Sequence, residues 1–225
     1  MIKAVLFDLD GTLLNRDESV KCFITNQYDR FQKFLSHLSK EDYVARFIEL
    51  DKRGYVWKDK VYQKMVDEFN LQLSWEVFLE DYITMFKHHC HPFPNLFDML
   101  EKLKEKEIRL GMITNGKNPF QMDNIEALKI RDYFDVILIS EEEGIKKPNP
   151  DIFHRALKKL DVSSHESMFV GDNPMNDVNG AQEVGMIGIW KRDPEWIQVE
   201  ADYVVEDLLE LTEIIEEHNS KQTMI

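Results

Sequence analysis

The sequence predicts an α/β fold, in which a parallel sheet covered by helices on both faces is interrupted near its start by a helical insertion. Two observations support this prediction. Short apolar segments alternate with helical segments in the later part of the chain, and a long stretch near the start has only helical spacing. The 225 residues, 43% of them hydrophobic, are enough for one substantial core and a smaller second one.

The first strand is expected at Lys3–Asp8. This segment, KAVLFD, is rich in β-branched and apolar residues and ends in a carboxylate. Gly11 and Thr12 then break the pattern. We therefore expect a buried strand whose carboxyl end carries an aspartate.

The insertion is expected over residues 16–91. The stretch contains one glycine, Gly54, and no proline before residue 92, and aromatic and aliphatic residues recur at helical spacing. Pro92 and Pro94 then indicate a linker back to the sheet. The predicted domains are an α/β core over 1–15 and 92–225 and a helical insertion over 16–91.

Strands and helices alternate after the linker. The expected strands are Arg109–Thr114, Val136–Ser140, Met168–Gly171, Met186–Trp190 and Tyr203–Val205. The expected helices are Leu96–Lys106, Pro119–Leu128, Pro150–Leu160, Pro174–Val184 and Glu206–Glu217. This alternation is typical of a parallel sheet, and ligands bind at the carboxyl ends of the strands in such sheets. An insertion directly after the first strand would lie above that edge.

Composition narrows the function classes. A formal charge of −14 disfavours nucleic acid as a partner, because nucleic-acid affinity depends on basic residues. A small phosphate ester is still compatible, since a metal ion and a lysine can create a local positive site. No apolar run reaches the roughly 18 residues of a membrane span, so we expect no membrane association and a cytoplasmic location. Cys22 and Cys90 are expected to be free thiols, and the chain to be a monomer or homodimer.

Residues able to do chemistry follow four of the expected strands. They are Asp8 and Asp10 after the first, Thr114, Asn115 and Gly116 after the second, Lys146 and Lys147 beyond the third, and Asp172 and Asp177 after the fourth. Strand ends of a parallel sheet converge in space, and four carboxylates so close together would raise one another's pKa unless a cation were present. Oxygen ligands without histidine or cysteine favour Mg²⁺ over zinc.

The same residues suit attack on phosphorus. Asp8 can form an aspartyl-phosphate, and Asp10 is placed to protonate the leaving alcohol and later to activate water. The donors expected for the phosphoryl oxygens are Lys147, the Thr114 hydroxyl and the backbone amides around Asn115 and Gly116. Thr114 and Asn115 could also cap the following helix, which is compatible with a phosphate site.

Four segments resemble, in order, the four motifs of the haloacid dehalogenase superfamily. They are DLDGT (Asp8–Thr12), ITNG (Ile113–Gly116), GIKKPNPDIF (Gly144–Phe153) and VGDNPMND (Val170–Asp177). The resemblance implies a Rossmann-like core with Asp8 as nucleophile and Asp10 as acid and base. It also implies that Thr114 and Lys147 bind the phosphate. Magnesium would be held by Asp8, the Asp10 carbonyl and Asp172, with Asp177 in or near the metal's second shell. The lysine beside proline matches the motif, so Lys147 is preferred to Lys146. The insertion is similar to the small cap of the phosphoglycolate-phosphatase-like branch, which shields the site and selects the substrate.

The function expected is hydrolysis of a small phosphomonoester, with nucleoside monophosphates and sugar phosphates as the best substrate classes. A sugar phosphomutase would use the same core, and remains an alternative. Dehalogenation is disfavoured by Asp10 and by Asp172 at the metal site. A phospho-accepting signalling module needs neither a carboxylate at Asp10 nor a large insertion, and is disfavoured for that reason.

Two segments of the insertion allow more than one interpretation. His88-His89-Cys90-His91 could be a metal cluster, but adjacent helical residues point in different directions and no second ligand pair is evident, so we expect the end of a helix and its linker. Asp51–Lys60 combines basic and aromatic residues around Gly54. Arg53 and Trp57 could contact a substrate from this loop, or the segment could be an exposed connection between helices.

Overall fold

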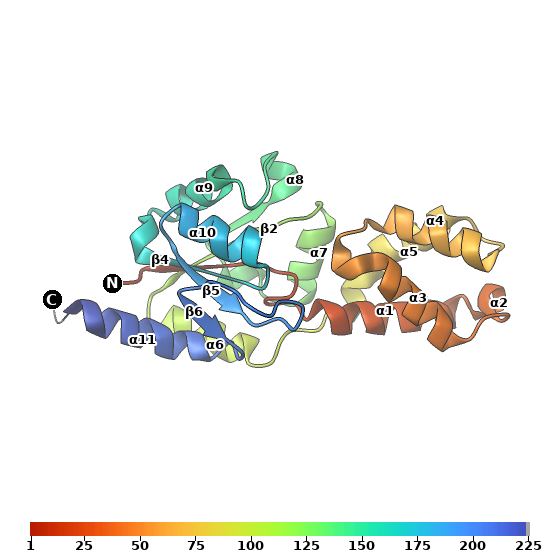
Figure 1. Cartoon of the computed structure of the whole chain (residues 1–225), viewed down its shortest axis with the longest axis horizontal. Helices are drawn as coiled ribbons and strands as arrows, with labels where there is room; N and C mark the ends of the chain where they lie inside the picture. The colour runs from red at the N-terminus through yellow and green to blue at the C-terminus, as the bar shows by residue number, and fades with distance from the viewer. Residues whose placement is uncertain (224–225) are drawn as a thin grey trace. The chain divides into compact units, whose positions relative to one another are not determined.

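The computed structural model describes residues 1–223, which divide into two compact units (Figure 1). One unit, here called the core unit, comprises Met1–Asn15 and the chain from Pro92 onward. The other, the helical unit, is Arg16–His91. None of the helices in residues 1–223 is long and apolar enough to cross a membrane.

A six-stranded sheet lies at the centre of the core unit, and every strand pair is parallel. The strands are β1 (Ala4–Phe7), β2 (Arg109–Thr114), β3 (Val136–Ile139), β4 (Ser167–Gly171), β5 (Ile187–Lys191) and β6 (Tyr203–Val205). Their order is β3-β2-β1-β4-β5-β6, so β1 pairs with strands distant in sequence on both sides. Phe7, its last residue, lies opposite Met112 of β2 and Val170 of β4. Asp8 therefore leaves the middle of the sheet at its carboxyl edge.

Helices cover both faces of this sheet, which confirms the predicted fold class. They are α6 (Leu96–Glu105), α7 (Phe120–Ala127), α8 (Ser140–Glu143), α9 (Pro150–Leu160), α10 (Gly180–Glu183) and α11 (Glu210–Thr223), with short 3₁₀ turns η3 (Arg131–Tyr133) and η4 (Ser164–Glu166). Figure 1 shows α9 and α10 on one face and α6 and α11 on the other. Apolar residues of α9, among them Phe153 and Leu157, pack on Leu6, Ile113 and Phe169 of the sheet.

The helix predicted at Pro174–Val184 is present, but its first half is π-helical instead of α-helical. A π-helical turn, η5 (Pro174–Asn179), precedes α10. The Asn173 side chain accepts the backbone N–H groups of Met175 and Asn176, and the wider turn carries Asp177 back over Gly171. A Cβ at Gly171 would lie 2.3 Å from the Asp177 side chain, so glycine is needed for this approach. Such turns are frequent at functional sites.

Several other element ends differ from the prediction by a residue or more, and two of these differences have a clear cause. Ser140 begins α8 instead of ending β3, and its hydroxyl accepts the backbone N–H of Gly116 at 3.0 Å. The last helix begins at Glu210 instead of Glu206. The Glu210 carboxylate accepts the backbone N–H of Asp207 at 2.8 Å, which holds the preceding residues in a turn.

The helical unit consists of helices packed around aromatic side chains. Its elements are α1 (Arg16–Arg30), α2 (Gln32–Leu35), α3 (Lys40–Asp51), η1 (Lys52–Gly54), α4 (Lys58–Phe69), α5 (Trp75–Met85) and η2 (Phe86–His89). Gln27 is fully buried, and its side-chain oxygen accepts the hydroxyls of Tyr43 and Tyr62 at 3.0 and 2.9 Å. Its nitrogen donates to Asp81 at 2.8 Å. The polar groups at the centre of this unit are thus paired with one another, as burial requires.

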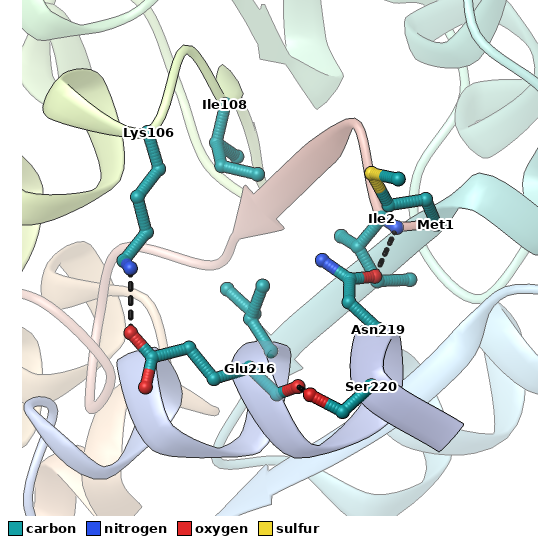
Figure 2. A pocket seen from close by; sticks show the side chains of 8 residues that line it. Met1, Ile2, Lys106, Ile108, Glu216, Asn219 and Ser220 are labelled. Atoms are coloured by element: carbon teal, nitrogen blue, oxygen red, sulfur yellow. Dashed lines mark hydrogen bonds and ion pairs between the residues drawn. The ribbon is translucent and has the colours of Figure 1, made fainter. Parts of the chain in front are cut away.

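A pocket of about 320 Å³ lies beside the amino ends of β1 and β2, on the edge of the sheet opposite Asp8 (Figure 2). Asn219 of α11 accepts the backbone N–H of Ile2 at 2.7 Å there, and Lys106 forms an ion pair with Glu216 at 2.6 Å. The first contact ties the last helix to the start of the chain, and the second ties it to the segment between α6 and β2.

Candidate active site

The residues predicted in the core unit meet at the carboxyl edge of the sheet. Asp8 follows β1, Thr114 ends β2, and Asp172 follows β4. Lys147 enters from the segment between α8 and α9. The Asp8, Thr114 and Lys147 side chains are all buried, whereas Lys146 is exposed, and Lys147 is the lysine that reaches the cluster.

Lys147 lies between two carboxylates. Its Nζ donates to Asp8 Oδ1 at 2.6 Å and forms an ion pair with Asp177 Oδ1 at 2.7 Å. Burial alone would lower the pKa of Lys147, but Asp177 and Asp8 raise it above its usual value. The lysine is therefore held as a cation next to the expected nucleophile.

The carboxylates are crowded enough to resist ionisation. One oxygen from each of Asp8, Asp172 and Asp177 lies within 4.8 Å of the others. Burial raises the pKa of Asp8 to about 7, against the opposing effect of Lys147 and with a further contribution from Asp177. Burial, Asp8 and Asp177 raise the pKa of Asp172 well above its usual value. A divalent cation would relieve this repulsion.

The donor set fits Mg²⁺. Its atoms are all carboxylate oxygens, the ligands that hard cations prefer. Lys147 and the backbone N–H of Asn173 engage the two oxygens of Asp177, so Asp8 and Asp172 have the more open carboxylates. The indole N–H of Trp190 donates to the Asp172 backbone oxygen at 3.0 Å and holds that residue in place.

Gly11 makes the approach of Asp172 possible. A Cβ at Gly11 would lie 2.4 Å from Asp172 Oδ2, and the backbone φ of +85° there also favours glycine. The Asp172 carboxylate thus lies directly against the turn that carries Asp8 and Asp10. This contact explains why the glycine of DLDGT is needed at the site.

Asn115 and Gly116 have protein partners at this edge. The Asn115 side chain donates to the Lys147 backbone oxygen and accepts the Lys147 backbone N–H, both at 2.9 Å. Asn115 therefore fixes the backbone of the lysine. The Gly116 N–H donates to Ser140, so phosphate binding by this amide would require that bond to open.

Two buried residues at this edge of the sheet, Gln121 and Lys191, were not predicted as site residues from the sequence. Gln121, in the first turn of α7, donates from Nε2 to Asp10 Oδ2 at 2.8 Å and to Thr114 Oγ1 at 2.6 Å. Lys191 ends β5, with its ammonium 3.5 Å from the centre of the Phe93 ring, and burial lowers its pKa. Lys191 could have been predicted from its position at the end of a strand. Gln121 could have been predicted from its place as a polar residue in the first turn of the helix that follows Thr114.

Arg53 and Trp57 share a loop of the helical unit. Arg53 has a left-handed backbone, with φ of 54°, and its guanidinium lies 3.3 Å from an Asp17 oxygen. Trp57 precedes α4, and the Lys58 ammonium lies 5.7 Å from the centre of its ring. Asp51, which is buried, pairs with Lys58 and anchors the loop.

The histidine-rich segment forms η2 and the residues after it. His89 Nδ1 lies 3.4 Å from Cys22 Sγ, and the His91 backbone N–H donates to Ser19 Oγ at 2.9 Å. Cys22 and Cys90 are free thiols. The segment thus closes the helical unit against α1.

Comparison with known proteins agrees with this architecture. The chain is 28% identical to the glyceraldehyde 3-phosphate phosphatase of Pyrococcus furiosus, over 97% of this chain and 95% of that protein. It is 31% identical to the pyrimidine 5'-nucleotidase YjjG of Escherichia coli, over 62% of this chain and 63% of that protein. A crystal structure of a HAD phosphatase from Thermococcus onnurineus is 31% identical, with a TM-score of 0.68 over 95% of this chain and 98% of that one.

The family assignment rests on a match to most of the chain. The model of the haloacid dehalogenase-like hydrolases matches residues 5–190, a range that starts in β1, spans the helical unit and ends in β5. All four motif segments lie within it. The chain therefore belongs to the haloacid dehalogenase-like hydrolase family.

Proposed function

We propose that this protein is a Mg²⁺-dependent phosphatase that hydrolyses a small phosphomonoester, a sugar phosphate or a nucleoside monophosphate, through an aspartyl-phosphate. The observation that supports the proposal is the contact of Lys147 Nζ with Asp8 Oδ1 at 2.6 Å, because a positive charge beside this buried carboxyl group suits its proposed role as the nucleophile. Asp10, two residues further on, supplies a second acid.

In the first step, Asp8 attacks phosphorus while the bond from phosphorus to the leaving oxygen breaks. Asp10 gives its proton to that oxygen, so the alcohol leaves neutral. Lys147 and the Thr114 hydroxyl stabilise the charge on the phosphoryl oxygens.

In the second step, Asp10 takes a proton from water as the water oxygen attacks phosphorus. The bond between phosphorus and the Asp8 oxygen then breaks, which restores both carboxyl groups and releases inorganic phosphate. Asp8, the Asp10 backbone carbonyl and Asp172 would hold the magnesium, with Asp177 close behind them. Bound there, the ion would offset negative charge on the carboxylates and on the phosphate.

Substrate choice is the less constrained part of the proposal. The P. furiosus relative is named for a triose phosphate and the E. coli relative for pyrimidine nucleotides, which supports both substrate classes. We assign selection between them to the helical unit, acting as a cap, with Arg53 and Trp57 as its candidate contacts. The charge and aromatic ring of these two residues suit a phosphorylated, ring-containing ligand.

The test is phosphate release from a panel of sugar phosphates and nucleoside monophosphates, with Mg²⁺ and with EDTA. Asp8→Asn should abolish turnover with the fold intact, while Asp98→Asn, at an exposed position on α6, should leave it unchanged. Turnover that survives in Asp8→Asn would exclude the nucleophile. Isomerisation of a sugar phosphate that needs a bisphosphate activator, with no accumulation of inorganic phosphate, would indicate a mutase instead.

A further inference from the structure

Gln121 connects the two strand ends on which the proposed chemistry depends. Its Nε2 atom lies 2.8 Å from Asp10 Oδ2 and 2.6 Å from Thr114 Oγ1. We propose that Gln121 is a positioning residue, which orients the Asp10 carboxyl toward the leaving group and the Thr114 hydroxyl toward the phosphate. This inference rests on the proposed phosphatase function.

The chemistry of the partners determines which end of the Gln121 amide faces them. Asp10 Oδ2, the oxygen that faces the amide, accepts hydrogen bonds both in a carboxylate and in an acid whose proton is on Oδ1, so the oxygen end of the amide would be repelled by it. The nitrogen end carries two protons, one for each partner. The amide is thus a double donor at this point.

The consequence for Thr114 concerns the direction of its single proton. A hydroxyl that accepts a hydrogen bond still has its own proton to donate, and Gln121 occupies one acceptor position of Oγ1. The Thr114 proton is therefore directed away from Gln121. At a phosphate site, the available acceptor is a phosphoryl oxygen.

The consequence for Asp10 concerns rotation of its carboxyl group. With Oδ2 held by Gln121, Oδ1 is the oxygen left to carry a proton to the leaving group or to take one from water. Without the contact the carboxyl group could rotate, and a misplaced general acid loses much of its effect.

The surroundings of Gln121 are built to hold it. The residue is 2% exposed. A Cβ at Gly116 would lie 2.6 Å from Gln121 Cγ, so the glycine after Asn115 leaves the space into which Gln121 folds. Gly116 and Gln121 therefore depend on each other, because the Gln121 side chain fills the space that a side chain at residue 116 would occupy.

The experiment compares two substrates with Gln121→Met, which keeps the length of the side chain and removes both donors. β-Glycerophosphate has a poor leaving group that needs a proton, whereas p-nitrophenolate leaves without one. We use kcat/KM because it reports the transfer of phosphate to Asp8 and excludes hydrolysis of the intermediate. We expect kcat/KM to fall about 100-fold for β-glycerophosphate and no more than about tenfold for p-nitrophenyl phosphate.

The control is Asn124→Leu, at another buried polar position of the same helix. It should change kcat/KM for the two substrates by the same factor. Gln121→Glu gives a second variant of similar size, in which a carboxylate faces Asp10, and should show the same unequal loss as Gln121→Met. Circular dichroism and thermal unfolding show whether each variant is folded.

An equal fall on both substrates in the folded Gln121 variants, or no fall, would overturn the inference. If the wild-type protein with Mg²⁺ releases phosphate from neither substrate nor from the panel above, the proposed function fails instead. The two failures are distinguished by the wild-type measurement alone.

Discussion

Magnesium binding at the cluster of Asp8, Asp172 and Asp177 should strengthen steeply with pH. A carboxylate must lose its proton before it can bind a cation, so metal binding and proton release are linked. The pKa of Asp8 is raised by burial to about 7, which brings this competition into the physiological range. The perturbation is therefore a change of pH at constant ionic strength.

The raised pKa of Asp8 sets the size of the effect. With a pKa of about 7, the ratio of protonated to deprotonated Asp8 is about 30 to 1 at about pH 5.5. At about pH 8 the ratio is about 1 to 10. The apparent Kd for Mg²⁺ should thus be about 30-fold weaker at the lower pH, or about 2 kcal/mol in binding free energy. Asp172, whose pKa is also raised, can only add to this difference.

The same reasoning gives the sign of the effect on stability. The folded pKa of Asp8 lies above the unfolded value of about 3.9, so the metal-free fold gains stability from this group at low pH and loses it as pH rises toward 7. Magnesium should offset that loss. We expect Mg²⁺ to raise Tm more at about pH 8 than at about pH 5.5.

Isothermal titration calorimetry at the two pH values measures the Kd, and thermal unfolding with and without Mg²⁺ measures the shift in Tm. In Asp8→Asn the pH dependence should shrink to the part due to Asp172. Equal Kd values at both pH values, or tighter binding at the lower one, would refute the raised pKa as the controlling quantity.

Two predictions concern the helical unit. Asp51→Asn should lower the free energy of unfolding by about 3 kcal/mol in denaturant, because Arg16 and Lys58 lose their buried counter-charge. The control, Asp67→Asn at an exposed position, should change this free energy by no more than about 0.5 kcal/mol. Burial opposes ionisation of Asp51, but its basic partners lower its pKa, so its contribution should be present above about pH 4 and be lost as pH falls through the lowered pKa. Arg53→Ala or Trp57→Ala should raise KM for the natural substrate more than for p-nitrophenyl phosphate, and equal effects on both would count against a contact with the substrate.

Much of the core could be predicted because the relevant signals are local. Buried strands such as Arg109–Thr114 appear as short apolar runs, and the rule that parallel strand ends converge brings residues as distant as Asp8 and Lys147 into one site. The choice of Lys147 depended on the proline that follows it. Its buried position between two carboxylates agrees with that choice.

Features that depend on distant partners could not be predicted in the same way. The π-helical turn at Pro174–Asn179 forms around the Asn173 side chain and the close approach of Asp177 to Gly171, and periodicity contains neither. Apart from its place in the first turn of the helix after Thr114, nothing in the sequence around Gln121 marks it as a site residue. The role proposed for it depends on the contact that it makes from α7 with Asp10, 111 residues away.

The position of β1 in the middle of the sheet has a consequence for the time at which activity can begin. The strand is synthesised first, but it is flanked by β2 and β4, and Asp8 donates its backbone N–H to Val170 of β4 at 2.9 Å. A growing chain therefore contains Asp8, the proposed nucleophile, long before the elements that surround it. Assembly of the sheet closes loops of over 100 residues, an arrangement associated with slow folding. Asp8 and Lys147, the pair on which the proposed catalysis depends, thus come together only after β2 and β4 have joined β1, so the proposed activity would be a late report of folding.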